Sequence, residues 1–197
     1  MSSTPAPGKH TPPSEPGHSP FPRSHLLLRA VWNMTWLLLA SWTPPQMRAW
    51  RVFLLRLFGA KIGKYADVRG SARVWYPPNL EMADHTTIAG GVQCYNMDRI
   101  ILHARTVVSQ RSFLCGGTHD IRAPSPYLPL VTRPIEIGPD AWIAAEAFIG
   151  PGCQVPAGCV IGARAVVFKG LEPWSVYAGN PARKVSSRPQ QPPLISA

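Results

Sequence analysis

The stretch "CGGTHD", residues 115 to 120, holds the strongest candidate for acid–base chemistry in this sequence. Histidine has a pKa close to the working pH of most enzymes, so His119 can take a proton from a hydroxyl group that is itself a very weak acid. Gly116 and Gly117 beside it leave room for a ligand. The segment "DIRAPSPYLPLVTRP" that follows, residues 120–134, is the kind of irregular loop on which proteins mount binding residues. His119 is therefore the candidate catalytic base.

A six-residue repeat must build the scaffold that positions this histidine. An aliphatic residue or its equivalent recurs at every sixth position, with two-residue shifts before residues 82 and 102 and a long break before residue 137. Neither the 3.6-residue period of a helix nor the two-residue period of a strand gives this spacing. The series reads Ile62, Val68, Val74, Met82, Ile88, Cys94, Leu102, Val108, Leu114, Ile137, Ile143, Ile149, Val155, Ile161 and Val167.

A second column lies four positions after the first and is mostly small. It contains Ala66, Ala72, Thr86, Val92, Thr106, Ser112, Thr118, Ala141, Ala147, Cys153, Cys159 and Ala165. A chain that places one aliphatic residue on each flat face and turns after every sixth residue winds into a triangular prism of parallel strands. We predict an all-β core over residues 60–185, with roughly five coils and a protruding loop at residues 120–134.

Two apolar segments precede the repeats and predict an amphipathic helical region over residues 24–59. The first apolar run, residues 26–42, is 17 residues long, at the lower edge of what spans a bilayer. In the second segment we expect one apolar face, with the arginines Arg48, Arg51 and Arg56 pointing elsewhere. That face would carry Met47, Trp50, Phe53, Leu54, Leu57 and Phe58.

Two interpretations of these helices stay open and are compatible. The helices can pack on the prism or on a neighbouring subunit. Residues 24–58 can also rest on an anionic membrane surface, with tryptophans at the interface, namely Trp32, Trp36, Trp42 and Trp50.

Composition limits the remaining classes of protein. The net charge is +10, and residues 1–61 hold seven Lys or Arg against one acid, so the excess gathers near the N-terminus. No nucleic-acid-binding motif accompanies it. Proline-rich ends predict disordered tails at residues 1–23 and 186–197. Four cysteines without CxxC spacing predict reduced thiols in a cytoplasmic protein, at most peripheral at the inner face of the membrane.

The repeats, the interruption after "CGGTHD" and the closing "IEIGPDAWIAAEAFIGPGCQVPAGCVIGARAVVFKGLEPWSVYAGNPARKV" together resemble the hexapeptide-repeat acyltransferases. The stretches "WRVFLLRLFGAKIGK" and "CYNMDRI" resemble the branch that acts in colanic acid biosynthesis; maltose, galactoside and nodulation-factor acetyltransferases are more distant. The resemblance covers residues 24–185. It implies a left-handed parallel β-helix, a homotrimer with active sites between prisms, and an acetyl-CoA-dependent O-acetyltransferase that modifies a sugar or glycan and needs no metal.

The resemblance also implies roles for individual residues. His119 would be the general base, and the backbone N–H of Ala145 would stabilise the oxyanion of the tetrahedral intermediate. Trp142 would line the channel for the acyl arm. Residues that would hold the coenzyme A nucleotide are Ala163, Lys169, Arg183 and Lys184, although Phe168 stands where relatives commonly carry threonine.

The acceptor site and the reaction class leave alternatives. Gln93, Asn96 and Asp120 are candidates for binding the acceptor, and Asp120 can instead orient His119. A zinc enzyme like the gamma-type carbonic anhydrases needs convergent histidines, yet the register shift puts His85 and His103 at different hexad positions. A non-catalytic β-helix binding protein would explain the prism but not the conjunction of "GGTHD" with "GNPARK".

Overall fold

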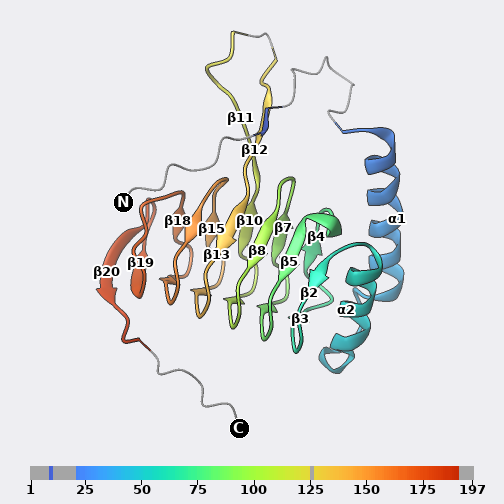
Figure 1. The fold of residues 1–197 in the computed structure, drawn as a ribbon, viewed down its shortest axis with the longest axis horizontal. Coiled ribbons are helices and arrows are strands. Elements are labelled where there is room, and N and C mark those ends of the chain that lie inside the picture. The colour runs from blue at the N-terminus through green and yellow to red at the C-terminus, as the bar shows by residue number, and fades with distance from the viewer. Residues whose placement is uncertain (1–8, 11–20, 125–126, 191–197) are drawn as a thin grey trace.

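The chain folds into a three-sided parallel β-helix with two helices at one end (Figure 1). This computed structural model describes residues 9–10, 21–124 and 127–190. Within those residues five complete coils of three short strands follow one another, and β19 begins a sixth. The prediction of a prism is confirmed, and the prism is slightly longer than the roughly five coils expected because the chain starts another turn at Ser175.

Each side of the prism is one sheet. The first sheet stacks β2 (Lys61–Ile62), β5 (Leu80–Met82), β8 (Ile100–Leu102), β13 (Ile135–Ile137) and β16 (Gln154–Val155). The second stacks β3 (Asp67–Val68), β6 (Thr87–Ile88), β9 (Val107–Val108), β14 (Trp142–Ile143), β17 (Val160–Ile161), β19 (Ser175–Ala178) and the antiparallel β20 (Arg183–Ser187). The third stacks β4 (Arg73–Val74), β7 (Gln93–Tyr95), β10 (Phe113–Cys115), β15 (Phe148–Ile149) and β18 (Val166–Val167). The chain turns from one sheet to the next at three edges of the prism. Each edge is named after the two sheets it joins, in chain order: first–second, second–third and third–first.

The predicted core positions form three vertical columns inside the prism. In the first sheet, for example, Ile62 pairs with Met82, which pairs with Leu102. All fifteen residues of the aliphatic series are buried. The small column is buried as well, except for Thr118, and its hydroxyl groups bond to backbone carbonyls, as Ser112 does to Ala144 at 2.8 Å. The six-residue period is therefore confirmed as the geometry of the core.

Extra residues at the third–first edge explain the two-residue register shifts. In the first coil this edge contains a 3-10 turn, Pro77–Asn79. In the second coil Asn96 ties the wide edge together, because its amide accepts a bond from Tyr76 N–H at 3.0 Å and donates one to Tyr76 O at 2.7 Å. Asn96 is fully buried. The proposal that Asn96 binds the acceptor is therefore wrong for this structure, since its side-chain amide is buried and hydrogen-bonded to the backbone of Tyr76.

The helical region consists of α1 (Arg23–Leu39), a 3-10 turn (Pro45–Met47) and α2 (Arg48–Leu57). This confirms two helices before the prism. Gly59, with φ at +95°, ends the second helix and turns the chain into β2. Neither helix in the described part of the chain is long and apolar enough to cross a membrane.

Side chains from both helices cap the open end of the prism. In the stack, the carbonyl of each core aliphatic residue accepts a bond from the preceding coil, as Met82 O does from Gly63 N–H at 2.7 Å. The first coil has no preceding coil, so its three core carbonyls need other donors. Arg56 donates to Ile62 O at 2.7 Å, Arg51 to Val68 O at 2.5 Å, and Trp32 to Val74 O at 2.7 Å.

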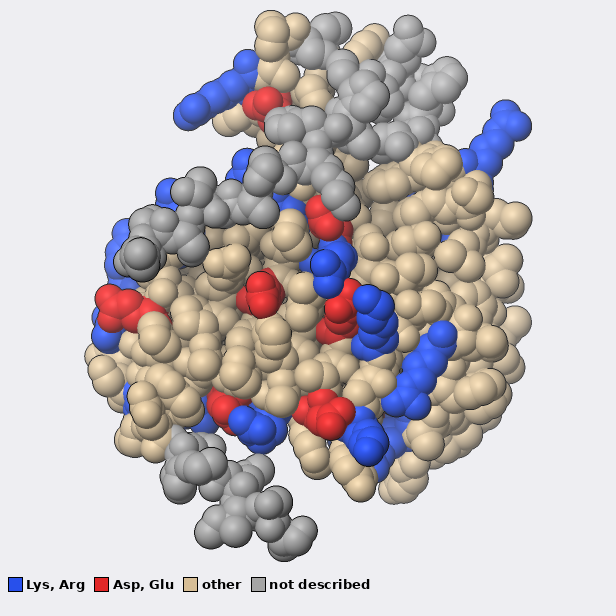
Figure 2. All heavy atoms as spheres, viewed as in Figure 1, with Lys and Arg blue, Asp and Glu red and all other residues tan. Residues whose placement is uncertain are grey.

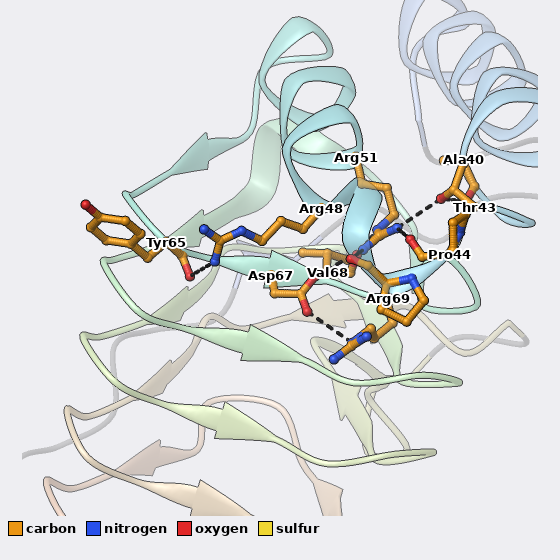
Figure 3. A network of polar contacts seen from close by, with 10 residues as sticks. Ala40, Thr43, Pro44, Arg48, Arg51, Tyr65, Asp67, Val68 and Arg69 are labelled. Atoms are coloured by element: carbon orange, nitrogen blue, oxygen red, sulfur yellow. Dashed lines mark hydrogen bonds and ion pairs between the residues drawn. The ribbon is translucent and has the colours of Figure 1, made fainter.

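Arg51 corrects the predicted orientation of α2. Its guanidinium is fully buried and also bonds to Thr43, to the carbonyls of Pro44 and Pro45 and to Asp67 (Figure 3). The predicted apolar face is divided, because Leu54 is buried whereas Trp50, Phe53 and Leu57 are exposed. The predicted orientation of Arg51 was wrong because hydropathy ignores unpaired carbonyls, which only a forked donor such as arginine can satisfy together.

The predicted disordered tails fall mostly outside the described residues. Inside them, β1 (Lys9–His10) pairs antiparallel with β12 (Leu130–Thr132). Phe21 packs against Trp75. At the other end, β20 runs two residues past the predicted domain boundary at 185, and Arg188 donates to the carbonyl of Asp140 at 2.7 Å.

Candidate active site

His119 lies on a β-ribbon that leaves the prism at the third–first edge (Figure 1). The ribbon pairs β11 (Gly117–His119) with β12, and His119 stands opposite Leu130. The chain departs at Gly116, which donates to Tyr95 O, and returns at Arg133, which donates to Gly116 O. The segment predicted as an irregular loop thus has a paired base, and His119 belongs to that base rather than to a coil of the prism.

The orientation of the His119 ring fixes its protonation pattern. Nδ1 lies 3.0 Å from the carbonyl oxygen of Leu128, and the side chain is exposed. A carbonyl oxygen can only accept, so Nδ1 must carry the proton of this bond. In the neutral ring Nε2 then has a free lone pair directed away from the bond. This is the arrangement that a general base requires.

Asp120 does not orient this ring. Its carboxylate accepts a bond from the backbone N–H of Arg122 at 2.9 Å, and its own N–H donates to Pro129 O. Asp120 therefore shapes the turn of the ribbon. Sequence reasoning missed the role of Leu128, because a backbone carbonyl nine residues away leaves no mark in residue types.

The two glycines before His119 are small for a packing reason. A Cβ on Gly117 would lie 2.5 Å from the sulfur of Met97, and one on Gly116 would lie 3.0 Å from Tyr95 O. Such approaches are closer than van der Waals contact allows. The glycines let the ribbon emerge tightly against the widened edge of the second coil.

The second–third edge carries the backbone groups that the resemblance assigns to the oxyanion and to the nucleotide. Ala145 and Ala163 stack there in successive coils, linked by the bond from Arg164 N–H to Ala145 O at 3.0 Å. Within the described residues, neither the Ala145 nor the Ala163 N–H has a hydrogen-bond acceptor. Both donors are therefore available to a ligand.

Charged side chains run alongside these amides. Glu146 lies 2.7 Å from Arg164 and 3.5 Å from Arg111, in an ion-pair ladder along the edge. The hydrogen bond from Arg164, followed by its positive charge, lowers the pKa of Glu146. The edge as a whole keeps an excess of positive charge, which suits an anionic ligand.

Trp142 lies on the outer face of the second sheet and is 47% exposed. Its Nε1 donates to Ser109 Oγ at 2.8 Å, which fixes the ring against the sheet. A flat, held aromatic surface of this kind can line a channel.

The remaining nucleotide candidates lie at the end of the prism away from the helices. Lys169 and Arg183 are exposed. Lys184 pairs with Glu172 at 2.7 Å, and this bond raises the pKa of the lysine. The exposed ring of Phe168 lies tilted against that of Phe148, with 5.8 Å between the ring centroids.

One chain does not bring all these groups together. His119 is at the third–first edge, whereas Ala145 and Ala163 are at the second–third edge, with the third sheet between them. Trp142 lies on the second sheet. The proposed base and the proposed oxyanion donor therefore face different sides of the same prism.

A cleft of about 720 Å³ lies between α1 and the third sheet. Gln93, a sequence-predicted acceptor residue, lines it and is exposed. Other lining residues, which the sequence did not single out, are Asn33, Arg73, Trp75, Tyr95 and Phe113. The aromatic rings continue beyond the cleft as a ladder along the third sheet, for example Phe113 to Phe148 at 5.5 Å. Aromatic walls with a few polar groups are typical of small-molecule sites.

The two histidines considered as zinc ligands have separate partners. His103 Nε2 lies 2.7 Å from Glu136, and His85 stacks on Tyr65. The part of the chain that the structure describes contains no group of three or more residues arranged to hold a metal ion.

Comparison with known proteins agrees with this architecture. The chain is 40% identical over 148 residues to the colanic acid biosynthesis acetyltransferase WcaF of Escherichia coli, a match that covers 75% of this chain and 80% of that protein. A chloramphenicol acetyltransferase of Klebsiella aerogenes is 46% identical over 52 residues, which is 26% of this chain and 25% of that one. No family model matches the chain.

Solved structures share the fold. A maltose O-acetyltransferase from Clostridium difficile superposes with a TM-score of 0.76 at 22% identity, covering 86% of this chain and 90% of that one. A hexapeptide-repeat acetyltransferase from Vibrio cholerae, in complex with acetyl coenzyme A, gives 0.73 at 20% identity, covering 85% and 91%. The prism is thus a left-handed β-helix of the hexapeptide-repeat type.

The relationship to WcaF, an acetyltransferase, decides in favour of the acetyltransferase class among those that the sequence left open. With 40% identity across four fifths of WcaF, the chain belongs to the colanic acid biosynthesis acetyltransferase family.

Proposed function

We propose that this protein transfers an acetyl group from acetyl-CoA to a hydroxyl group of an exopolysaccharide or surface glycan, with His119 as the general base. The relationship to WcaF carries the reaction class. The Nδ1–Leu128 bond supports the base, since it leaves Nε2 as a proton acceptor.

The reaction is a direct transfer in this account. His119 Nε2 takes the hydroxyl proton as the oxygen attacks the thioester carbonyl. The N–H of Ala145 donates to the developing oxyanion. As the carbon–sulfur bond breaks, the imidazolium gives its proton to the departing thiolate. No acyl-enzyme forms, because the acceptor oxygen itself attacks the thioester. Trp142 lines the acyl arm, and Ala163, Lys169, Arg183 and Lys184 hold the nucleotide.

The active site would be completed by a neighbouring copy. His119 and the Ala145 N–H lie at different edges of one prism, so a base from one copy must meet a donor from the next. A homotrimer with closed threefold symmetry provides three equivalent sites of this kind, each between two neighbouring copies.

The acceptor would enter through the cleft beside α1. Gln93 supplies an exposed amide, and Tyr95 and Phe113 supply ring faces for the apolar side of a sugar. Tyr95 also holds Gly116 at the root of the ribbon, which connects the cleft to the segment bearing His119. Asp120 acts through the shape of the ribbon.

We place the reaction in the cytoplasm. All four cysteines are free thiols, which suits a reducing compartment.

The test is transfer of labelled acetyl from acetyl-CoA to a panel of de-O-acetylated bacterial glycans, with release of free CoA measured in parallel. We expect acceptor-dependent CoA release by the wild type. His119→Ala should lose about 10²- to 10⁴-fold in rate while still binding acetyl-CoA. An unchanged transfer rate of His119→Ala would refute the role of His119 as the general base. Binding of acetyl-CoA by the wild type without transfer to any glycan would refute the proposal that the acceptor is a glycan.

A further inference from the structure

The two N-terminal helices present an apolar surface to solvent. We call it the α1–α2 face and define it by Leu27, Met34, Leu38, Trp42, Phe53 and Leu57, each of which is more than half exposed. In Figure 2 the side of the molecule over α1 shows almost only uncharged atoms. Monomeric proteins rarely expose contiguous apolar surface of this kind without a partner.

This surface cannot pack against the prism, because the opposite sides of both helices already contact the first coil. Leu27, Met34 and Leu38 follow one another on one side of α1, at spacings of seven and four residues. Trp32 and Trp36 lie on the other side and bond to carbonyls of the first coil. Arg51 fixes α2 in the same way. Capping the prism therefore forces the leucines outward.

The charged side chains of the helices and of the start of the first coil are all basic, although Glu81 of the next coil pairs with Lys61 at 3.3 Å. Residues 21–66 contain seven Lys or Arg and no Asp or Glu. Arg51 is buried, but five other cations are exposed around the helices and the first coil, namely Arg23, Arg48, Arg56, Lys61 and Lys64. Two exposed tryptophans belong to the same region: Trp42, part of the face, is 69% exposed, and Trp50 stacks on Phe53. Apolar side chains, exposed tryptophans and a basic rim are what an anionic lipid surface recognises.

We propose that the α1–α2 face binds the surface of an anionic lipid bilayer. A second copy of this chain is the less favoured occupant, because two such faces in contact would oppose their basic rims. The face lies at one end of the prism and β20 at the other, and α1 crosses the prism axis (Figure 1). On the bilayer α1 lies in the membrane plane, the prism stands away from it, and Arg183 and Lys184 stay in water. The proposal does not depend on the reaction assigned above.

The experiment is co-sedimentation of the full chain with vesicles of pure phosphatidylcholine and of phosphatidylcholine containing one third phosphatidylglycerol. The test variant is Leu27→Gln/Leu38→Gln/Phe53→Gln, and the matched control is Ile121→Gln/Val185→Gln, since those two side chains are exposed away from the helices. We expect the wild type and the control to bind the anionic vesicles, added salt to weaken that binding, and the test variant to bind at least about tenfold less.

Three outcomes would overturn the proposal. One is no binding of the wild type to anionic vesicles. Another is equal binding by the test variant, with its fold verified by circular dichroism. The third is a lower oligomeric state of the test variant in sedimentation velocity together with no vesicle binding by the wild type, which would assign the face to a second copy.

Discussion

The carbonyl oxygen of Leu128 lies 3.0 Å from Nδ1 of His119, across the ribbon that protrudes from the prism. The ribbon therefore does two things at once: it carries the imidazole out of the stack of coils and it determines which nitrogen holds the proton. The general base that we propose needs no carboxylate to hold its ring, and the Asp120 carboxylate instead accepts a bond from Arg122 N–H in the turn.

The tautomer can be observed directly. His119 should be protonated at Nδ1 in its neutral form, with Nε2 unprotonated. His103 is an internal reference, because its Nε2 lies 2.7 Å from the Glu136 carboxylate and must carry the proton there. Nitrogen-15 NMR of labelled imidazoles should show opposite patterns for the two residues; the same pattern in both would contradict the assigned geometry.

Mixing two inactive variants tests whether the site is shared between copies. His119→Ala lacks the base, and Lys169→Glu/Arg183→Glu should lose affinity for acetyl-CoA. If each site takes the base from one copy and the nucleotide residues from another, co-refolded mixtures should recover a substantial fraction of wild-type activity, because some sites receive both intact halves. Activity no higher than that of the separate variants would place the whole site within one chain.

Arg51 should be among the most important residues for stability. Arg51→Met keeps the volume but leaves the buried carbonyl of Val68 and the part-buried carbonyls of Pro44 and Pro45 without this donor, so we expect a loss of roughly 3 kcal/mol in the free energy of unfolding. Arg51→Lys should not restore it, because an ammonium cannot reproduce the fork. The exposed Arg48→Met is the control, with a change within about 0.5 kcal/mol in urea titrations. Equal losses of stability in Arg51→Met and Arg48→Met would show that the hydrogen bonds of Arg51 to the first coil do not stabilise the fold.

The buried thiols predict a loss of stability in alkali. Burial raises the pKa of the Cys94 thiol to about 12 and that of Cys153 to about 12. The unfolded chain releases these protons near pH 8.5, so above that pH the folded state binds more protons and its stability falls, by about 1.4 kcal/mol per pH unit per thiol. Below that pH the two thiols contribute no slope.

Cys94→Ala should remove one thiol's share of this slope, measured by urea titration at several pH values above 8.5. A slope equal to that of the wild type would mean that Cys94 ionises without unfolding.

The sequence predicted the prism well because its determinants are periodic and local. Every aliphatic position from Ile62 to Val167 packs where the six-residue period places it. The two-residue shifts were visible as well, but not their cause, since the bonds between Asn96 and Tyr76 join residues 20 apart.

The helices and the ribbon were harder to predict, for physical reasons. Hydropathy predicted one apolar face on α2 with Arg51 pointing elsewhere, whereas the unpaired carbonyl of Val68 draws Arg51 to the packed side and Trp50 and Phe53 are exposed. The ribbon depends on pairing between β11 and β12 across a long insertion with no repeat to mark it. His119 was identified by its motif, while its partner Leu128 acts through the backbone and is invisible in composition.

The most direct test of the account is the rate of acetyl transfer by His119→Ala with a de-O-acetylated glycan that the wild type modifies. With His119 as the general base, kcat should fall at least about 10²-fold while acetyl-CoA affinity is retained, because only the proton acceptor is removed. A kcat within a fewfold of the wild type would contradict that role.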